Sequence, residues 1–140
     1  MNIDQSKIED LIGTKINNLT LYQKAFTHKS AIKEYDTLND SFETLEFMGD
    51  SVLGFVITKF LFDKHENRQE GFLTKARTKL VRSETLASIA CKLGLHDWVL
   101  MDEKGMRNGW NHNPKILEDV FEALIGAIYM DLGLAHAKQF

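Results

Sequence analysis

The sequence contains very few of the residues that interrupt or cross-link a chain. Its 140 residues include one proline, Pro114, and one cysteine, Cys91. A single cysteine excludes an internal disulfide and fits a reducing compartment, so we expect a cytoplasmic protein. The scarcity of proline, the lack of a long polar tract and the lack of any polar–apolar alternation together argue against a β-rich fold. We therefore predict a mostly helical protein.

Membrane segments and an excess of positive charge are also missing. Charged residues interrupt every apolar run before it reaches membrane-spanning length, and the polar stretch after Met1 lacks the apolar core of a signal peptide. The net charge of −3 indicates no particular partner and argues mildly against nucleic-acid binding. With 44% hydrophobic and 26% charged residues, the chain fits one soluble domain over residues 1–140 that does not enter a membrane.

The order of apolar and polar segments predicts a series of helices. The expected helices cover residues 4–13, 19–28, 42–62, 71–83, 84–94 and 115–133, with a break near Arg82–Ser83 and a further helix from residue 134. The segments 33–41, 63–71 and 95–114 are polar or rich in glycine and asparagine, which is typical of loops. Asp40 or Ser41 is expected to cap the helix that begins near Phe42.

Two of these helices combine apolar faces with an acidic stripe. Glu43, Glu46 and Asp50 fall within an arc of roughly 60° on the first, given about 100° per residue. On the second, Asp119 and Glu122 lie three residues apart on one face. Gly54 lies in line with the first stripe and Gly126 with the second, and these glycines are expected to let the two helices approach closely.

The acidic stripes have two interpretations. The simpler one is that they are the solvated faces of two surface helices. However, both helices are apolar in most other directions, and buried carboxylates are costly unless they are paired, protonated or bound to a cation. The alternative is that the stripes converge on a divalent metal. Oxygen ligands without histidine or cysteine suit magnesium, with manganese as the alternative, and such ions assist phosphodiester cleavage.

Four blocks of the sequence resemble one known family. The stretch "ETLEFMGDSVL" at 43–53 is similar to the signature motif of ribonuclease III endonuclease domains. The other three similar blocks, in the order of the family, are "AFTHKS" at 25–30, "EGFLTKARTKLVRSETLASIA" at 70–90 and "KILEDVFEALIGAIYMDLG" at 115–133. Together they cover nearly the whole chain, so the resemblance does not depend on a single motif.

The resemblance implies a fold, a partner and a reaction. It implies an all-α homodimer that hydrolyses double-stranded RNA with magnesium and leaves 5′-phosphates and short 3′ overhangs. It also implies roles for individual positions. The catalytic and metal-binding carboxylates would be Glu46, Asp50, Asp119 and Glu122; the supporting acidic residues would be Glu43 and Glu70; and Phe47 would lie in the dimer interface.

Some features depart from the family pattern. Glu118 stands where the family usually has a small residue; we expect it to be exposed rather than to act as an outer-sphere carboxylate, so that its substitution would leave cleavage nearly intact. Phe42 and Thr44 also differ from the usual residues, but neither is expected to touch the carboxylates. Many members carry a double-stranded RNA-binding domain after the nuclease domain. None follows here, so either the chain is part of a longer protein or it acts without that domain.

Further candidate residues lie outside the acidic stripes. Lys75, Lys79 and Arg82 share a helix face, which is either simply solvated or contacts RNA phosphates; the resemblance favours the second. His28 is expected to pack or cap rather than catalyse, and the His96–Asp97 pair is too weak a motif to assign a metal. Cys91 is expected in the core, and Trp98 and Trp110 are expected to pack rather than stack on bases.

Three functions follow from these observations. The first is an active endoribonuclease specific for double-stranded RNA. The second is a binding module of the same fold that does not cleave, although members of that kind usually lack one or more of the four carboxylates. The third is a carboxylate-bridged di-iron bundle, which requires Glu-x-x-His pairs. No glutamate in this chain has a histidine three residues later. We expect the first.

Overall fold

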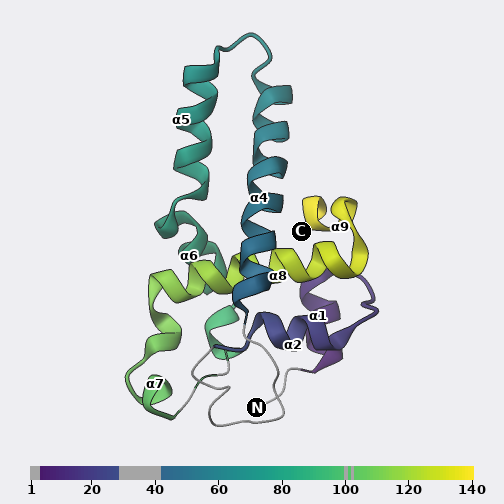
Figure 1. Cartoon of the computed structure of the whole chain (residues 1–140), viewed down its shortest axis with the longest axis vertical. Coiled ribbons are helices and arrows are strands. Elements are labelled where there is room, and N and C mark those ends of the chain that lie inside the picture. The colour runs from purple at the N-terminus through teal and green to yellow at the C-terminus, as the bar shows by residue number, and fades with distance from the viewer. Residues whose placement is uncertain (1–3, 29–41, 100, 102) are drawn as a thin grey trace.

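A computed structural model describes residues 4–28, 42–99, 101 and 103–140, which form helices and turns without a β-strand (Figure 1). The helices are α1 (Gln5–Ile12), α2 (Leu19–Ala25), α4 (Glu43–Lys64), α5 (Glu70–Val81), α6 (Ser83–Lys92), α7 (Glu103–Arg107), α8 (Pro114–Leu132) and α9 (Leu134–Gln139), with 3-10 turns η1 (Leu95–Asp97) and η2 (Trp110–His112). None of these helices is both long enough and apolar enough to span a bilayer.

Short-range hydrogen bonds explain where several helices begin and end. Asp4 accepts a hydrogen bond from the backbone of Ser6 and so caps α1, and Gly13 ends that helix with a φ of 86°. Asn113 caps α8 by accepting from the backbone N–H groups of its first turn, and Pro114 occupies the first helical position, where no N–H is needed.

The predicted boundaries agree with the structure in most places. α5 ends at Val81 and α6 begins at Ser83, with Arg82 in an extended conformation between them, so the predicted break is confirmed. The prediction that 95–114 is irregular was partly wrong, because the segment contains α7 and two 3-10 turns. The predicted loop at 33–41 and the cap at Asp40 or Ser41 lie outside the described residues.

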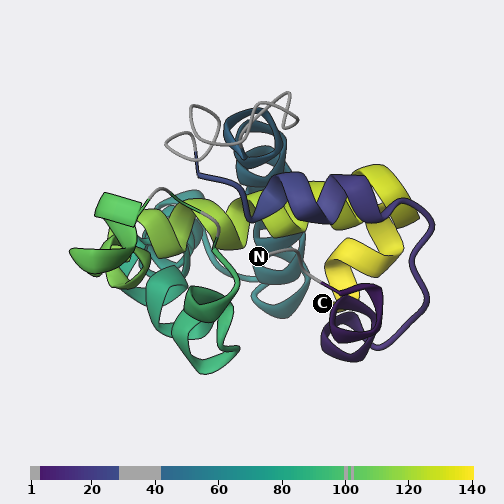
Figure 2. The same ribbon diagram turned by 90° about the horizontal axis from the view of Figure 1, so that it is seen from below.

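α8 is the central helix of the fold. It contacts α2, α4, α6 and α9, and Figure 2 shows it running through the middle of the helical layer with α2 alongside. Every residue from Val120 to Ile128 is buried, including Glu122. The core around it is completed by side chains from all parts of the chain, among them Ile8, Tyr22, Phe26, Leu45, Leu86, Leu95 and Val99.

α4 and α8 cross with their backbones in direct contact. A Cβ atom added to Gly49 would lie 1.6 Å from the carbonyl oxygen of Glu122, and one added to Gly126 would lie 2.2 Å from the carbonyl oxygen of Leu45. No side chain fits at either position. The expected close approach at Gly126 is therefore confirmed, but the expectation for Gly54 was wrong: that glycine faces open space, because the crossing lies one and a half turns earlier on α4.

Beyond this crossing, α4 and α5 extend together away from the remaining helices (Figure 1). Arg77 Nη1 of α5 donates a hydrogen bond to Thr58 Oγ1 of α4 at 3.1 Å, which ties the two helices together. α5 has no buried residue. Large apolar side chains on the pair are exposed to solvent, including Phe47, Phe55, Phe60, Phe62 and Phe72.

Candidate functional site

Carboxylates from α4 and α8 meet beside the glycine crossing. Glu46, Asp119 and Glu122 each place one carboxylate oxygen within 4.8 Å of the others. The backbone contact between Gly49 and Glu122 explains this, since it brings Glu46, one turn before Gly49, close to the second acidic stripe. We call these three residues the acidic cluster. The predicted convergence of the two stripes is thus a feature of the structure.

The acidic cluster is crowded and poorly solvated. Glu122 is 6% exposed. Burial is the largest effect that raises the pKa of Glu122 to about 9, and a hydrogen bond with Asp50 and its charge add to it. Burial also raises the pKa of Glu46 to about 7, with further contributions from the hydrogen bond and charge of Asp119. Glu122 therefore holds a proton at neutral pH, and Glu46 holds one about half of the time, unless a cation replaces it.

Asp119 has a buried oxygen that lacks a normal hydrogen bond. Its Oδ1 atom receives none from a described residue. Lys115 Nζ lies 3.0 Å away, close enough for an ion pair. The contact is therefore an ion pair that lacks the alignment of a hydrogen bond. This contact with Asp119 is also the main cause that raises the pKa of Lys115.

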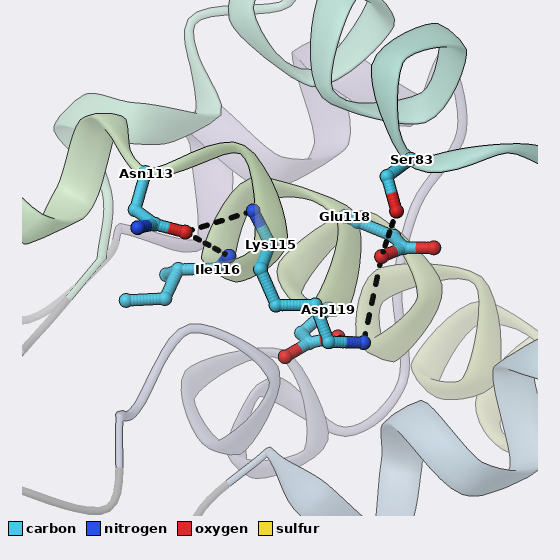
Figure 3. A network of polar contacts seen from close by, with 6 residues as sticks. All are labelled: Ser83, Asn113, Lys115, Ile116, Glu118 and Asp119. Atoms are coloured by element: carbon cyan, nitrogen blue, oxygen red, sulfur yellow. Dashed lines mark hydrogen bonds and ion pairs between the residues drawn. The ribbon is translucent and has the colours of Figure 1, made fainter.

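Glu118 is part of a polar network at the edge of the acidic cluster (Figure 3). Its Oε1 accepts a hydrogen bond from Ser83 Oγ at 2.9 Å and lies 3.4 Å from Lys115 Nζ. Its side chain is only 13% exposed. The expectation that Glu118 is exposed was therefore wrong, because α6 begins directly against this turn of α8 and its first residue, Ser83, covers the carboxylate.

A recess of about 150 Å³ adjoins the acidic cluster. It is lined by His28, Phe42, Glu43, Glu46, Ile116 and Asp119. The His28 ring packs edge-on against Phe42, with ring centroids 5.8 Å apart, which agrees with the expected packing role. Glu43 lies on the rim of this recess, one turn before Glu46, and so stands beside the acidic cluster.

The remaining predicted acidic residues lie at different distances from the acidic cluster. Asp50 is exposed and joins through its hydrogen bond with Glu122. Glu70 does not approach the acidic cluster of its own chain. It is the first residue of α5, and this helix begins at the far end of the α4–α5 pair (Figure 1). There Glu70 lines a pocket with Leu61, Phe62 and Arg77. Phe47 is 78% exposed.

The expectation that three basic residues share a helix face was partly wrong, because Lys75 and Lys79 lie on α5 but Arg82 follows it in an extended conformation. We call these three residues the basic face. Lys75, Lys79 and Arg82 are all exposed. Arg82 Nε lies 3.9 Å from Glu84 Oε2, so one of the three has an acidic neighbour. Arg82 directly precedes Ser83, so this face begins next to the residue that bonds Glu118.

Other sequence expectations had mixed outcomes. Trp98 packs edge-on against Phe26, with ring centroids 5.5 Å apart, and Trp110 also packs against the core. Cys91 is exposed, contrary to expectation, because α6 uses only the narrow stripe of Leu86, Ala87 and Ala90 to contact the core. Sequence reasoning missed Lys115, whose position four residues before Asp119 was the available signal.

Comparisons with known proteins agree with this architecture. The model of the ribonuclease-III-like family matches residues 18–140. A putative protein of Paramecium bursaria Chlorella virus 1 is 50% identical over 133 residues, which is 95% of this chain and 47% of that protein. Ribonuclease 3 of Staphylococcus aureus is 42% identical over 124 residues, or 88% of this chain and 51% of the enzyme.

Solved structures give the same result. The nuclease domain of ribonuclease III from Campylobacter jejuni superimposes with a TM-score of 0.88 at 38% identity, covering 97% of this chain and 92% of that one. The chain belongs to the ribonuclease-III-like family, and its all-α fold is that of the ribonuclease III nuclease domain. It spans about half the length of the curated relatives it matches.

Proposed function

We propose that this chain is the nuclease domain of a metal-dependent endoribonuclease that acts on double-stranded RNA as a homodimer. The products would carry 5′-phosphates and short 3′ overhangs. The observation that carries the proposal is the acidic cluster, which joins the two acidic stripes of a ribonuclease-III-like fold. Glu46, Asp50, Asp119 and Glu122 would form the catalytic site.

The donor groups fit magnesium or manganese. The acidic cluster offers oxygen ligands alone, which these hard cations prefer. The buried Oδ1 of Asp119 has no hydrogen bond among the described residues, and the pKa of Glu122 is raised to about 9. A divalent cation would supply a bonding partner for Asp119 Oδ1 and the positive charge that lets Glu122 ionise. Glu46, Asp119 and Glu122 would hold the ion directly, and Asp50 would complete the set.

The protein residues would prepare and orient the site. When bound, the ion would supply the Lewis acidity that activates water and stabilises charge on the leaving oxygen. Glu46 and Glu122 must lose their protons to bind it, so metal binding would release protons. The hydrogen bond with Asp50 fixes the orientation of Glu122, and the rigid α4–α8 crossing keeps the carboxylates from both helices in register.

A homodimer would provide two sites for the two strands. The exposed phenylalanines of α4 support this part of the proposal, since a partner subunit would remove these large apolar side chains from water. A two-fold interface would use the same patch on both subunits, with Phe47 within it. Glu70 lies far from the acidic cluster of its own chain, so any supporting role would be at the interface or in the partner.

The basic face would contact the RNA backbone. Duplex RNA is recognised mainly through its shape, phosphates and 2′-hydroxyl groups, which an exposed row of cations can contact. Lys75, Lys79 and Arg82 supply such a row. Because the chain has a net charge of −3, we expect binding to be weak and strongly dependent on salt.

The test uses perfectly paired RNA with the wild-type chain, with and without magnesium, read on a denaturing gel with labelled ends. The decisive variant is Glu122→Gln, which keeps the side-chain size but removes a ligand charge. We expect it to remain a folded dimer that binds RNA, with a cleavage rate lower by a factor on the order of a thousand. Manganese or raised magnesium should restore part of that rate.

Glu103→Gln is the matched control, because Glu103 is an exposed glutamate at the start of α7, outside the acidic cluster. It should cleave at the wild-type rate. If the wild-type dimer binds duplex RNA without cutting it at any magnesium concentration, the chain is a binding module. If Glu122→Gln cuts as well as the wild type, the acidic cluster is not the active site.

A further inference from the structure

Lys115 is a cation held within reach of the acidic cluster. Its Nζ lies 3.0 Å from Asp119 Oδ1 and 3.4 Å from Glu118 Oε1. The lysine side chain is 68% exposed, whereas those of Glu118 and Asp119 are 13% and 15% exposed. The ammonium group therefore approaches the two carboxylates from the solvent side. Figure 3 shows its contact with Glu118 next to the Asp119 side chain.

Glu118 is held in place independently of Lys115. Ser83 Oγ donates a hydrogen bond to the same Oε1 atom at 2.9 Å, and Ser83 is the first residue of α6, which packs against α8. Glu118 would consequently keep its position if the ammonium left Asp119. The sequence places Lys115, Glu118 and Asp119 on adjacent turns of α8, where residues three and four apart are neighbours.

An ammonium group and a divalent cation compete for the same carboxylate. Asp119 is one of the three residues whose oxygens could hold a metal, and Lys115 already lies against its Oδ1. Two positive charges within a few ångströms repel each other strongly where water is scarce. Lys115 must therefore move away from Asp119 when a metal enters, and Glu118 is the acceptor already within its reach.

We propose that Lys115 is an internal counter-ion that occupies the metal's place beside Asp119, and that Glu118, anchored by Ser83, is a positioning residue that takes over the ammonium when metal binds. This inference rests on the proposed metal site. It makes metal binding an exchange of cations within the protein. The strength of the Lys115–Glu118 contact then determines how readily Asp119 becomes available.

The experiment measures manganese binding by isothermal titration calorimetry, without RNA and independently of activity. Lys115→Met removes the competitor and should tighten manganese binding about tenfold. Lys92→Met is the matched control, because it removes the same charge from the exposed C-terminal end of α6, and it should change the affinity less than twofold. Both substituted lysines are exposed, so both variants are expected to fold.

The double variant separates positioning from simple electrostatics. Glu118→Gln should weaken manganese binding about fivefold, because the ammonium then loses its alternative charged acceptor and stays on Asp119. In the Lys115→Met background the same change should have a much smaller effect. If Glu118 acts only through its own charge, its loss should matter as much or more without the lysine nearby, and that result would overturn the proposal. Ser83→Ala should weaken binding in the same direction as Glu118→Gln, by a smaller factor.

The outcomes also separate this inference from the proposed function. If neither the wild type nor Lys115→Met binds manganese at millimolar concentration, the metal site itself is wrong. If the wild type binds manganese but Lys115→Met binds it no more tightly than Lys92→Met does, the metal site stands and the counter-ion role of Lys115 is refuted.

Discussion

α4 and α8 look alike in sequence but have different environments. Both are long apolar helices with one acidic stripe. α8 buries every residue from Val120 to Ile128 among helices of its own chain. The 22 residues of α4 bury only Leu45, Gly49, Val52 and Leu61. Apolarity around a helix thus does not by itself mean that the helix is buried within its own chain.

The acidic residues of the two helices differ in burial in the same way. Glu122 on α8 is 6% exposed, whereas Asp50 on α4 is exposed. The aromatic residues differ similarly: Phe121 of α8 is buried, and Phe47 of α4 is 78% exposed. α8 is therefore the scaffold of the fold, because helices of its own chain bury its central residues. α4 contributes Leu45, Gly49 and Val52 to the packing around α8, whereas most of its residues are not buried within the single chain.

The largest effect is expected where the two helices touch. Gly126→Ala would place a Cβ atom 2.2 Å from the carbonyl oxygen of Leu45, and backbone cannot move aside as a flexible side chain can. We expect the helices to separate, with a loss of more than about 4 kcal/mol in the free energy of unfolding. Urea denaturation followed by circular dichroism measures it.

Gly54→Ala is the control for that substitution. It lies on the same helix pair but faces open space, so alanine should raise the stability by about 0.5–1 kcal/mol through its higher helix propensity. Equal losses of stability in Gly54→Ala and Gly126→Ala would mean that α4 and α8 do not cross at Gly126.

An intermediate effect is expected at Phe47, one of the exposed phenylalanines of α4. Phe47→Asp puts a charge on a surface that we propose to be the dimer interface, and it should weaken dimerisation by a factor on the order of a hundred, or about 3 kcal/mol. The monomer should keep its helical circular dichroism, because Phe47 is exposed within one chain. Sedimentation velocity measures the assembly.

Val120→Asp provides the contrast on the scaffold helix. Val120 is fully buried, so a charge there should unfold the chain itself rather than only separate two copies. A wild-type chain that sediments as a monomer at micromolar concentration would exclude the proposed dimer. Unfolding of Phe47→Asp to the same extent as Val120→Asp would show that α4 is needed within the single chain as much as α8.

The sequence predicted the parts of the site that follow from helix periodicity. The spacing of Glu46 and Asp50, and of Asp119 and Glu122, predicted two acidic faces, and the apolar surroundings predicted that they meet. It did not predict Gly49 as the contact point, because Gly49 lies off the acidic stripe and only the crossing angle selects it. The sequence also did not predict that Ser83 covers the Glu118 carboxylate, since Ser83 lies 35 residues away in the chain.

The smallest expected effect is the pH dependence of stability that comes from one glutamate on each of the two helices. Glu122 on α8 has a pKa of about 9 and Glu46 on α4 a pKa of about 7, both raised from 4.5 chiefly by burial. Between the unfolded and folded pKa values these two groups bind more protons in the native state than in the unfolded state, so their contribution to stability is greatest at low pH and falls as pH rises. We expect a metal-free loss on the order of 2 kcal/mol between about pH 5 and 9, less than the full shifts imply because neighbouring carboxylates share protons.

Two variants and added magnesium should show how much each helix contributes to the change of stability with pH. Glu122→Gln cannot ionise, so it should remove the loss of stability above about pH 7, where only Glu122 still titrates, and about half of the loss below it. Glu46→Gln should reduce only the loss below about pH 7. Saturating magnesium should flatten the whole curve, because a bound cation stabilises the deprotonated carboxylates. Thermal unfolding followed at several pH values, with magnesium or with chelator, measures all three. A stability that rises between pH 5 and 9 in the metal-free wild type would show that the carboxylates of the acidic cluster are not buried together.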